Sequence, residues 1–257
     1  MTTQHKGYGA HSDKARIRYM DGSKLSRPFD MPKSQLSVLV VFVVIAIIFG
    51  GMFLFNTYDN VINRDAKAAA SLEANLNKPT TLDLPVLTGL MLLDDNTIKT
   101  GFTDAGLTFH EFSAGADWSG GLDIIKLPTD ITAIDAGLAY SSGIENLSAA
   151  DAVKYLNGSW RLQVARGEYV DMKLKYADFT SSDAETAIQT ALASEGLDAS
   201  ASDPIATDEA GNTFQEGLVD TEGSTYSWRI ATCPLADVYN IDGMPATAQY
   251  VVVRMHQ

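Results

Sequence analysis

The chain has 257 residues, of which 46% are hydrophobic and 20% are charged. This length and composition allow one large domain or two modest ones with a buried core, and they exclude disorder along the whole chain. The formal net charge is −13, and since phosphate contacts need a basic surface, we expect no nucleic acid partner. Cys233 is the single cysteine, so no disulfide can form within the chain and stability must come from packing.

The charge and hydropathy of the N-terminal part predict a tail followed by a membrane anchor. Residues 1–35 carry seven Lys and Arg against three Asp, a net charge of +4, whereas the residues after Gln35 sum to −17. This polar composition predicts a disordered, basic cytoplasmic tail. Residues 36–55, LSVLVVFVVIAIIFGGMFLF, contain no charge. Twenty helical residues cover about 30 Å, roughly the hydrocarbon thickness of a bilayer, so we predict a transmembrane helix with the basic side in the cytoplasm.

A cleaved signal peptide is the main alternative to this anchor. The apolar core of such a leader is usually about 7 to 15 residues long, and a small-residue cleavage site follows closely. The present run is longer, and the nearest Ala-x-Ala pattern, Ala68 to Ala70, lies well beyond Phe55. A prepilin-like first helix is a further alternative, although no processing site or acidic residue stands at the head of the run. We therefore predict an uncleaved anchor that contacts membrane lipid and leaves the C-terminal region extracytoplasmic.

Residues 56–79 are rich in alanine and predict a helical stalk that continues the membrane helix. Pro79 ends this predicted helix. Two features suggest a parallel homodimer through the stalk. One is the pair of small residues Ala46 and Gly50 inside the span, and the other is a set of apolar stalk residues at spacings of three and four. These stalk residues are Ile62, Ala66, Ala69, Leu72 and Leu76.

The remaining residues predict an α+β extracytoplasmic region, a mostly antiparallel sheet with about three helices. Trp160 and Trp228 stand inside alternating strand patterns, so we expect both in the core. A capping-box pattern of Ser182 and Glu185 is expected to begin the third helix. The predicted helices cover 94–106, 148–158 and 182–196. The predicted strands cover 107–112, 122–127, 159–165, 168–176, 212–219, 225–233 and 248–255.

A working division places a first α+β lobe at 80–147 and a second at 148–257. Two faint echoes raise the question of duplication: IKTGFTDAGL matches IQTALASEGL in its apolar positions, and SWRL recurs as SWRI. The offsets between the two pairs disagree, so ordinary helix-end and strand chemistry remains the preferred explanation.

Residues 84–109, LPVLTGLMLLDDNTIKTGFTDAGLTF, resemble the opening strand and helix of PASTA domains, small α+β modules found outside bacterial membranes. The resemblance implies a strand followed by a helix in this stretch. The Pro and Gly pattern that follows the helix in that family is missing, so no function is carried over from it.

The sequence offers no recognisable catalytic, metal or cofactor motif. There is no nucleophile elbow, phosphate loop or dinucleotide fingerprint, and His110 and His256 lack the spacing of zinc ligands. The acidic stretch 203–212 does not have the spacing of an EF-hand, and turn chemistry explains its carboxylates equally well. We therefore predict no catalytic residues, no metal and no cofactor.

The predicted ligand-binding residues belong to the loop SAGADWSGG and the strand that enters it. Trp118 stands among small residues, with Asp117 beside it and His110 and Glu111 on the incoming strand. An exposed aromatic ring near polar groups is typical of a platform for a sugar or a peptide. A Trp that folds back to close the edge of the core is the structural alternative.

Taken together, the sequence predicts a single-pass membrane-anchored binding, scaffolding or assembly component of a bacterial cell envelope, with an envelope protein or cell-wall partner. The alternative is an envelope enzyme without a recognisable motif that uses acidic residues and His110. Tail, anchor, stalk and globular head in this order are typical of the first class.

Overall fold

The computed structural model describes residues 41, 43–49, 52–53, 57, 61–112 and 120–257. Residues 1–64 and 65–257 form separate compact units. The predicted tail lies wholly outside the described residues, and the predicted membrane anchor lies partly outside them. Within the described part of the chain, no helix combines the length and the hydropathy needed to cross a membrane.

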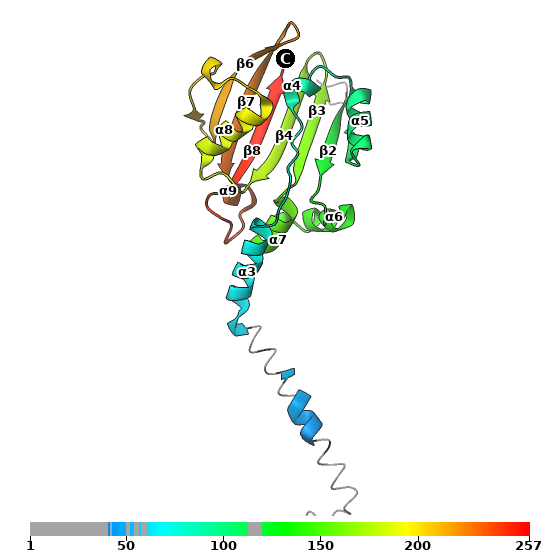
Figure 1. Cartoon of the computed structure of the whole chain (residues 1–257), viewed down its shortest axis with the longest axis vertical. Coiled ribbons are helices and arrows are strands. Elements are labelled where there is room, and N and C mark those ends of the chain that lie inside the picture. Colours follow the sequence, from blue (N-terminus) through cyan, green and yellow to red (C-terminus); the bar gives the residue numbers. More distant parts are fainter. Residues whose placement is uncertain (1–40, 42, 50–51, 54–56, 58–60, 113–119) are drawn as a thin grey trace, which may run out of the picture. The chain divides into compact units, whose positions relative to one another are not determined.

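An eight-stranded antiparallel sheet forms the centre of the unit 65–257 (Figure 1). Its strand order is β1-β2-β3-β4-β8-β7-β6-β5. Strands that are consecutive in the chain pair with each other except β4 and β5, and β8 lies between β4 and β7. The strands are β1 (Thr108–Phe112), β2 (Gly120–Lys126), β3 (Trp160–Arg166), β4 (Val170–Asp178), β5 (Ala206–Thr207), β6 (Thr213–Thr221), β7 (Ser224–Pro234) and β8 (Gln249–His256).

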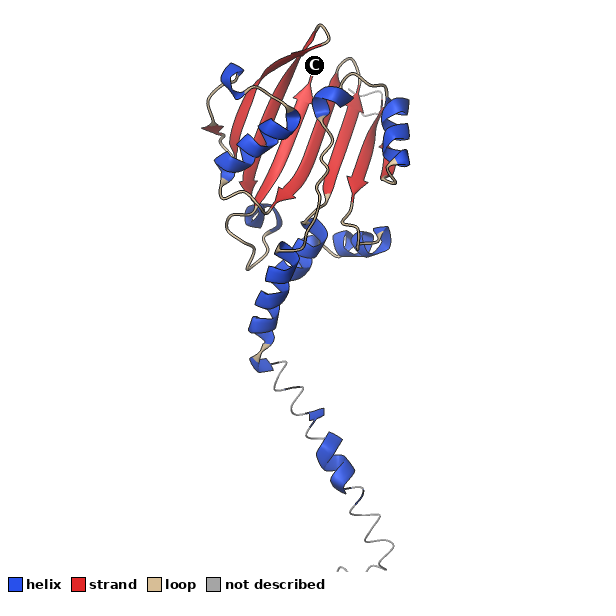
Figure 2. Ribbon diagram, viewed as in Figure 1, coloured by secondary structure: helices blue, strands red, loops and turns tan. Residues whose placement is uncertain are grey.

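The helices lie over one face of this sheet or gather at one end of it (Figure 2). α4, α5 and α8 cover the face, and α6, α7 and α9 lie at the end nearest α3. The helices are α3 (Arg64–Leu76), α4 (Leu87–Leu90), α5 (Asp95–Asp104), α6 (Ala133–Ser141), α7 (Ala149–Leu156), α8 (Ala184–Glu195) and α9 (Leu235–Tyr239), with short 3-10 helices at Ile144–Asn146 and Ala199–Ala201.

The core between the sheet and the covering helices arises from strict alternation along the strands. In β8, every second residue is buried and the residues between them are half-buried. β7 follows the same pattern over most of its length. The predicted core residues Trp160 and Trp228 are both 3% exposed, and the indole N–H of Trp160 donates to the Leu82 carbonyl at 2.8 Å. The α+β class and the core position of both tryptophans are thus confirmed.

The ends of the predicted helices agree closely with the structure, with one correction. Asp94 caps α5 through the amide of Thr97, and Ser148 caps α7. The cap of α8 is Asp183, which accepts from the Thr186 amide, so the predicted capping box at Ser182 is wrong by one residue. The Asp carboxylate is as good a cap as the Ser hydroxyl, and Asp183 is the residue that directly precedes the helix.

Three further helices, α4, α6 and α9, carry no clear sequence signal. α6 has Ile134 and Leu138 exposed at 75% and 64%, so it lacks the apolar inner stripe from which helices are recognised. Residues 84–86 form no strand, and the strand implied by the PASTA resemblance is therefore absent from the described structure.

The two predicted lobes share one sheet and one core. β2, from the first predicted lobe, pairs with β3 from the second along seven register positions. The main apolar cluster also contains side chains from both segments, for example Ile98 and Leu122 together with Leu174 and Val253. The predicted boundary near Ser148 therefore assigns strands of one continuous sheet to two different lobes.

The C-terminal half of α3 packs against the rest of its unit. Leu72 and Leu76 join a second apolar cluster with Val153 of α7. Asn75 donates to the Ala150 carbonyl at 2.7 Å, and its own carbonyl accepts from Asn157 at 2.9 Å. Two of the apolar positions assigned to a homodimer seam in the predicted stalk thus have partners inside the same chain.

Candidate functional site

The structure describes only part of the predicted ligand-binding site. Trp118 and Asp117 belong to residues 113–119, which lie outside the described part. Glu111 of β1 forms an ion pair with Lys99 of α5, on the helix-covered side of the sheet. His110 occupies the register position opposite Asp123 of β2. The candidate site consists of other residues.

We call the side of the sheet opposite α5 and α8 the open face. On the central strands β3, β4, β8 and β7, its side chains alternate with the buried apolar residues and are mostly polar. An antiparallel sheet can leave one face to solvent, which accounts for a polar surface as such. The unusual feature is its charge pattern. Its polar side chains are Arg161 and Gln163 of β3, Asp171, Lys173 and Lys175 of β4, Tyr250, Arg254 and His256 of β8, and Ser227 and Arg229 of β7, and its small or apolar ones include Ala165, Ala177, Ala231, Cys233 and Val252.

Basic residues stand directly opposite one another on the open face. Lys173 pairs with Arg254, and Arg254 pairs with Arg229, so three cations lie side by side on β4, β8 and β7. Arg161 stands opposite Lys175 on β3 and β4. Like charges directly opposite in a ladder are destabilising. Residues 65–257 hold 28 Asp and Glu against 11 Lys and Arg, a net charge of −17, and yet five of the 11 bases share this face.

Asp171 holds the middle of the basic row together. Arg254 donates to its two carboxylate oxygens from Nε at 2.8 Å and from Nη2 at 3.2 Å, and Lys173 Nζ lies 3.1 Å away. The Asp171 side chain is only 4% exposed. Burial acts to raise its pKa, but the hydrogen bonds from Arg254 and Lys173 outweigh burial and lower the pKa below the usual value. Asp171 is therefore an ionised, fully engaged carboxylate.

Arg229 is fixed by contacts on three sides. Its Nη2 lies 3.1 Å from Asp208 and its Nη1 lies 3.5 Å from Glu216. The guanidinium stacks on the Phe214 ring with 3.8 Å between the guanidinium carbon and the ring centroid. Asp208 also accepts from the Asn212 amide at 2.9 Å within its own turn. The carboxylate of Asp208 thus serves a turn and an arginine, and the described residues contain no group of three metal-ligating side chains.

Lys175 differs from the other bases of the open face. Its ammonium donates to the Gln163 side-chain oxygen at 3.0 Å, and no carboxylate among the described residues forms an ion pair with it. Burial is the main cause that lowers the pKa of this amine, and the charges of Arg161 and Lys173 add to it. The position is electrostatically costly, and a carboxylate beside it would relieve that cost.

Three tyrosines border the basic residues at the end of the sheet where α6 and α9 lie. The Tyr239 ring of α9 packs edge-on against the Tyr250 ring of β8, with 6.1 Å between centroids. Tyr140 of α6 is 46% exposed. Burial raises the pKa of all three phenols, so they stay neutral and can donate an O–H. Tyr and Arg are both enriched in protein interfaces.

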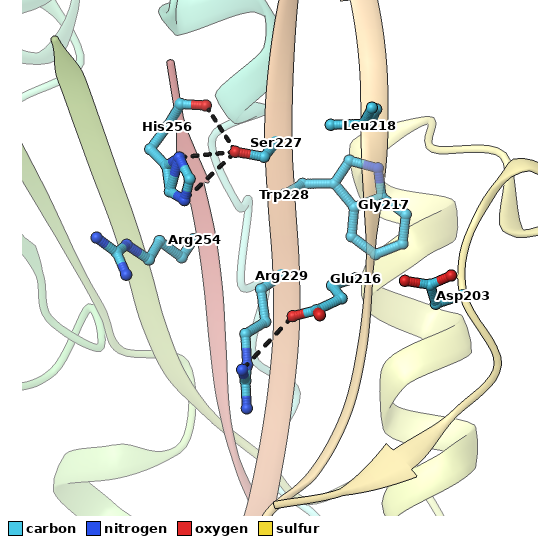
Figure 3. A pocket seen from close by; sticks show the side chains of 9 residues that line it. All are labelled: Asp203, Glu216, Gly217, Leu218, Ser227, Trp228, Arg229, Arg254 and His256. Carbon is cyan, nitrogen blue, oxygen red and sulfur yellow. Dashed lines mark hydrogen bonds and ion pairs between the residues drawn. The ribbon is translucent and has the colours of Figure 1, made fainter.

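A pocket of about 390 Å³ lies where β8, β7 and β6 run side by side (Figure 3). Arg254, His256, Ser227 and Arg229 lie on one side of β7 and β8, and Trp228 lies on the other. The Ser227 hydroxyl is 2.7 Å from Nδ1 of His256. Glu216 and Asp203 also line the pocket, so its lining mixes both signs of charge.

The Ser227–His256 contact places a hydroxyl beside a general base, which is half of a nucleophilic site. A third group that orients the histidine is not found among the described residues, because Arg254 and Lys173 take the oxygens of the neighbouring Asp171. The thiol of Cys233, in β7, has a raised pKa through burial and so stays protonated. This cysteine is half-buried.

No protein-family model matches the chain, and no curated protein or solved structure shows significant similarity to it.

Proposed function

We infer that this chain is a single-pass membrane-anchored binding, scaffolding or assembly component of a bacterial cell envelope, whose open face contacts its partner. The anchor rests on the uncharged residues 36–55 and the placement outside the cytoplasm rests on the basic tail that precedes them. The acidic unit 65–257 is the part displayed.

The main support for the binding role is the pairing of like charges on the open face. Lys173, Arg254 and Arg229 lie in one row in a unit of net charge −17. The main apolar cluster lies on the other side of the strands, so its packing does not require these cations. Asp171, Asp208 and Glu216 balance this row, whereas Lys175 beside Arg161 forms no ion pair with a described carboxylate. A sheet face that retains such a charge beside tyrosine is best explained as a contact surface.

Cross-linking in intact cells tests the binding role. A photoreactive amino acid replaces Ala165 or Val252 on the open face, and in a matched control it replaces the exposed Gln189 on α8. We expect a discrete cross-linked species from Ala165 and Val252 and none from Gln189. Equal yield from all three positions, or none from the open face, would overturn the assignment of this face.

The membrane placement has its own test. Carbonate washing of vesicles should leave the full chain in the membrane fraction, and protease added to cells stripped of any outer barrier should digest the unit 65–257. Release of the intact chain by carbonate, or protection of that unit from protease, would contradict the anchor or its orientation.

An envelope enzyme remains the second candidate. The His110 version of this idea has no described side-chain geometry, but the Ser227–His256 contact gives the class a specific pair of residues. If the enzyme reading is correct, Ser227→Ala abolishes a measurable turnover while cross-linking from Val252 persists. If the binding reading is correct, no turnover depends on the Ser227 hydroxyl, and a turnover that Ser227→Ala leaves unchanged would reject the enzyme reading.

A further inference from the structure

Four cations form the electrostatic centre of the open face, and we name them the basic patch: Arg161, Lys173, Lys175 and Arg254. They lie on the adjacent strands β3, β4 and β8. Two carboxylates balance them in part, Asp123 beside Arg161 and Asp171 beside Lys173 and Arg254. The basic patch therefore keeps two positive charges in excess inside an acidic unit.

Both arginines of the basic patch are already oriented by an aspartate. Arg161 donates to Asp123 from Nε at 2.8 Å and from Nη2, and Arg254 donates to Asp171 through the same two nitrogens. In both residues Nη1 has no hydrogen-bond acceptor within the described structure. A guanidinium held in this way keeps an outward N–H edge for a second acceptor, with little rotamer entropy left to lose on binding.

The distance between Lys173 and Lys175 sets the spacing at which the carboxylates of a partner can bind. Residues two apart on a strand are about 7 Å apart on the same side, and neighbouring strands are about 5 Å apart. Acidic side chains at alternate positions of an extended peptide repeat at the same interval of about 7 Å. Such a peptide, laid along β4, meets Lys173 and Lys175 with successive carboxylates and brings each one close to an arginine on the strand beside it.

We propose that the partner of the open face presents an extended acidic protein segment, with carboxylates at alternate positions, to the basic patch. The inference rests on the proposed binding function and names the chemistry of the partner. Tyr140, Tyr239 and Tyr250 border the patch and supply aromatic contact area of the kind that protein interfaces use.

A nucleic acid, a phosphate polymer or an anionic membrane fits this surface less well. Each of these extends well beyond the patch, and the unit around the patch carries the net charge of −17. The Debye length is about 8 Å at physiological salt, so repulsion from nearby acidic groups acts on any wide polyanion. A short acidic segment needs only the patch itself.

Binding of a defined peptide to the full chain in nonionic detergent micelles tests the proposal. The probe is a short fluorescent peptide in which Glu and Thr alternate, and its controls replace every Glu by Gln or place the same number of Glu residues consecutively. Fluorescence anisotropy should show saturable binding of the alternating Glu peptide, with at least about tenfold weaker binding of the Gln peptide and weaker binding of the consecutive one.

Variants of the chain locate the binding. Lys175→Met should weaken binding about fivefold and Lys175→Glu at least about tenfold, since one charge is lost in the first and reversed in the second. Lys154→Gln, an exposed lysine of α7 away from the open face, should stay within about twofold. Thermal melts of the same samples show that each variant is folded, and a glutamate between Arg161 and Lys173 gains partners, so Lys175→Glu is expected to fold.

Equal binding of the Gln peptide, or an unchanged affinity in Lys175→Glu, would overturn the proposal. Binding of tripolyphosphate or of phosphatidylglycerol vesicles with no binding of the peptide would also overturn it, in favour of a phosphate polymer or a membrane surface. Cross-linking from Ala165 and Val252 in cells combined with failure of the peptide would reject the acidic segment and leave the binding function standing. Loss of both would reject the two together.

Discussion

The covered face of the sheet buries Leu162, Leu174 and Ile230 completely, whereas the next residues of the same strands place Arg161, Lys175 and Arg229 on the open face. Because side chains alternate between the two faces of a strand, each strand supplies residues to both faces, and different requirements act on the two sets. On the covered face, volume and shape decide which residue fits. On the open face, packing imposes little, and the charges found there need a different cause.

The largest expected effect separates the two faces by stability. Leu174→Ala on the covered face should lower the free energy of unfolding by about 2–5 kcal/mol, because Leu174 is fully buried and the truncation leaves a cavity. Gln163→Ala, on the open face of the neighbouring strand, should lower it by only about 0.5–1.5 kcal/mol, because it removes a single hydrogen bond, the one to the Lys175 ammonium. Urea unfolding of both variants measures the difference. Similar losses in the two would mean that the open face is packed against something in the folded chain.

A buried carboxyl interrupts the covered face and gives it a pH dependence. Glu195, near the end of α8, accepts the Leu87 amide of α4 at 2.7 Å, and burial raises its pKa to about 7. The folded state then holds a proton that the unfolded state releases above its ordinary pKa. Stability is therefore expected to fall as the pH rises from about 4.5 to 7, by on the order of 2–3 kcal/mol.

Glu195→Gln tests this sign, since Gln keeps an acceptor for the Leu87 amide and cannot ionise. The variant should lose the slope between pH 4.5 and 7 in urea unfolding, while the parent chain keeps it. The aspartates with lowered pKa values, such as Asp171 and Asp178, act at lower pH and leave this window clear. A parent chain that gains stability from pH 4.5 to 7 would contradict the assignment.

The sheet and its core were largely predictable from the sequence, and the reason is local. Alternation in WRLQVA and EYVDMKLKY identified which residues of β3 and β4 share a face, and α8 ends at Gly196, with φ 68°, where the predicted helix 182–196 also ends. The order of strands was not predictable, because β8 pairs with β4 and β7 through contacts between distant parts of the chain.

The charge pattern of the open face was not predictable either, because it depends on the strand order. Lys173, Arg254 and Arg229 are neighbours only through the strand order, so no local pattern brings them together. The one local signal was KLK in β4, which places two lysines on the face opposite the buried Leu174. Trp118, the residue favoured by loop composition, lies outside the described residues, and its predicted role remains a prediction.

A smaller effect is expected where the open face has its own internal support. Arg254→Met removes both bonds from the guanidinium to the buried Asp171 and leaves only Lys173 beside it, so the free energy of unfolding should fall by about 1–3 kcal/mol. Asp171→Asn should reduce the effect of Arg254→Met, because the buried charge is gone. A double-mutant cycle in urea measures this coupling. Strictly additive effects would show that Arg254 and Asp171 do not act as a pair.

The smallest expected change in stability is the most informative about the open face. Lys175 is half-buried, stands opposite Arg161, and has a pKa lowered by burial and by neighbouring cations, so its charge costs folding free energy. Lys175→Met keeps the length of the side chain and removes that charge. Unfolding in urea should therefore show no loss and up to about 0.5 kcal/mol of gain, while peptide binding weakens. A surface residue whose removal stabilises the fold and weakens binding is retained for the partner, whereas a loss of stability in Lys175→Met would place Lys175 among the residues that hold the sheet together.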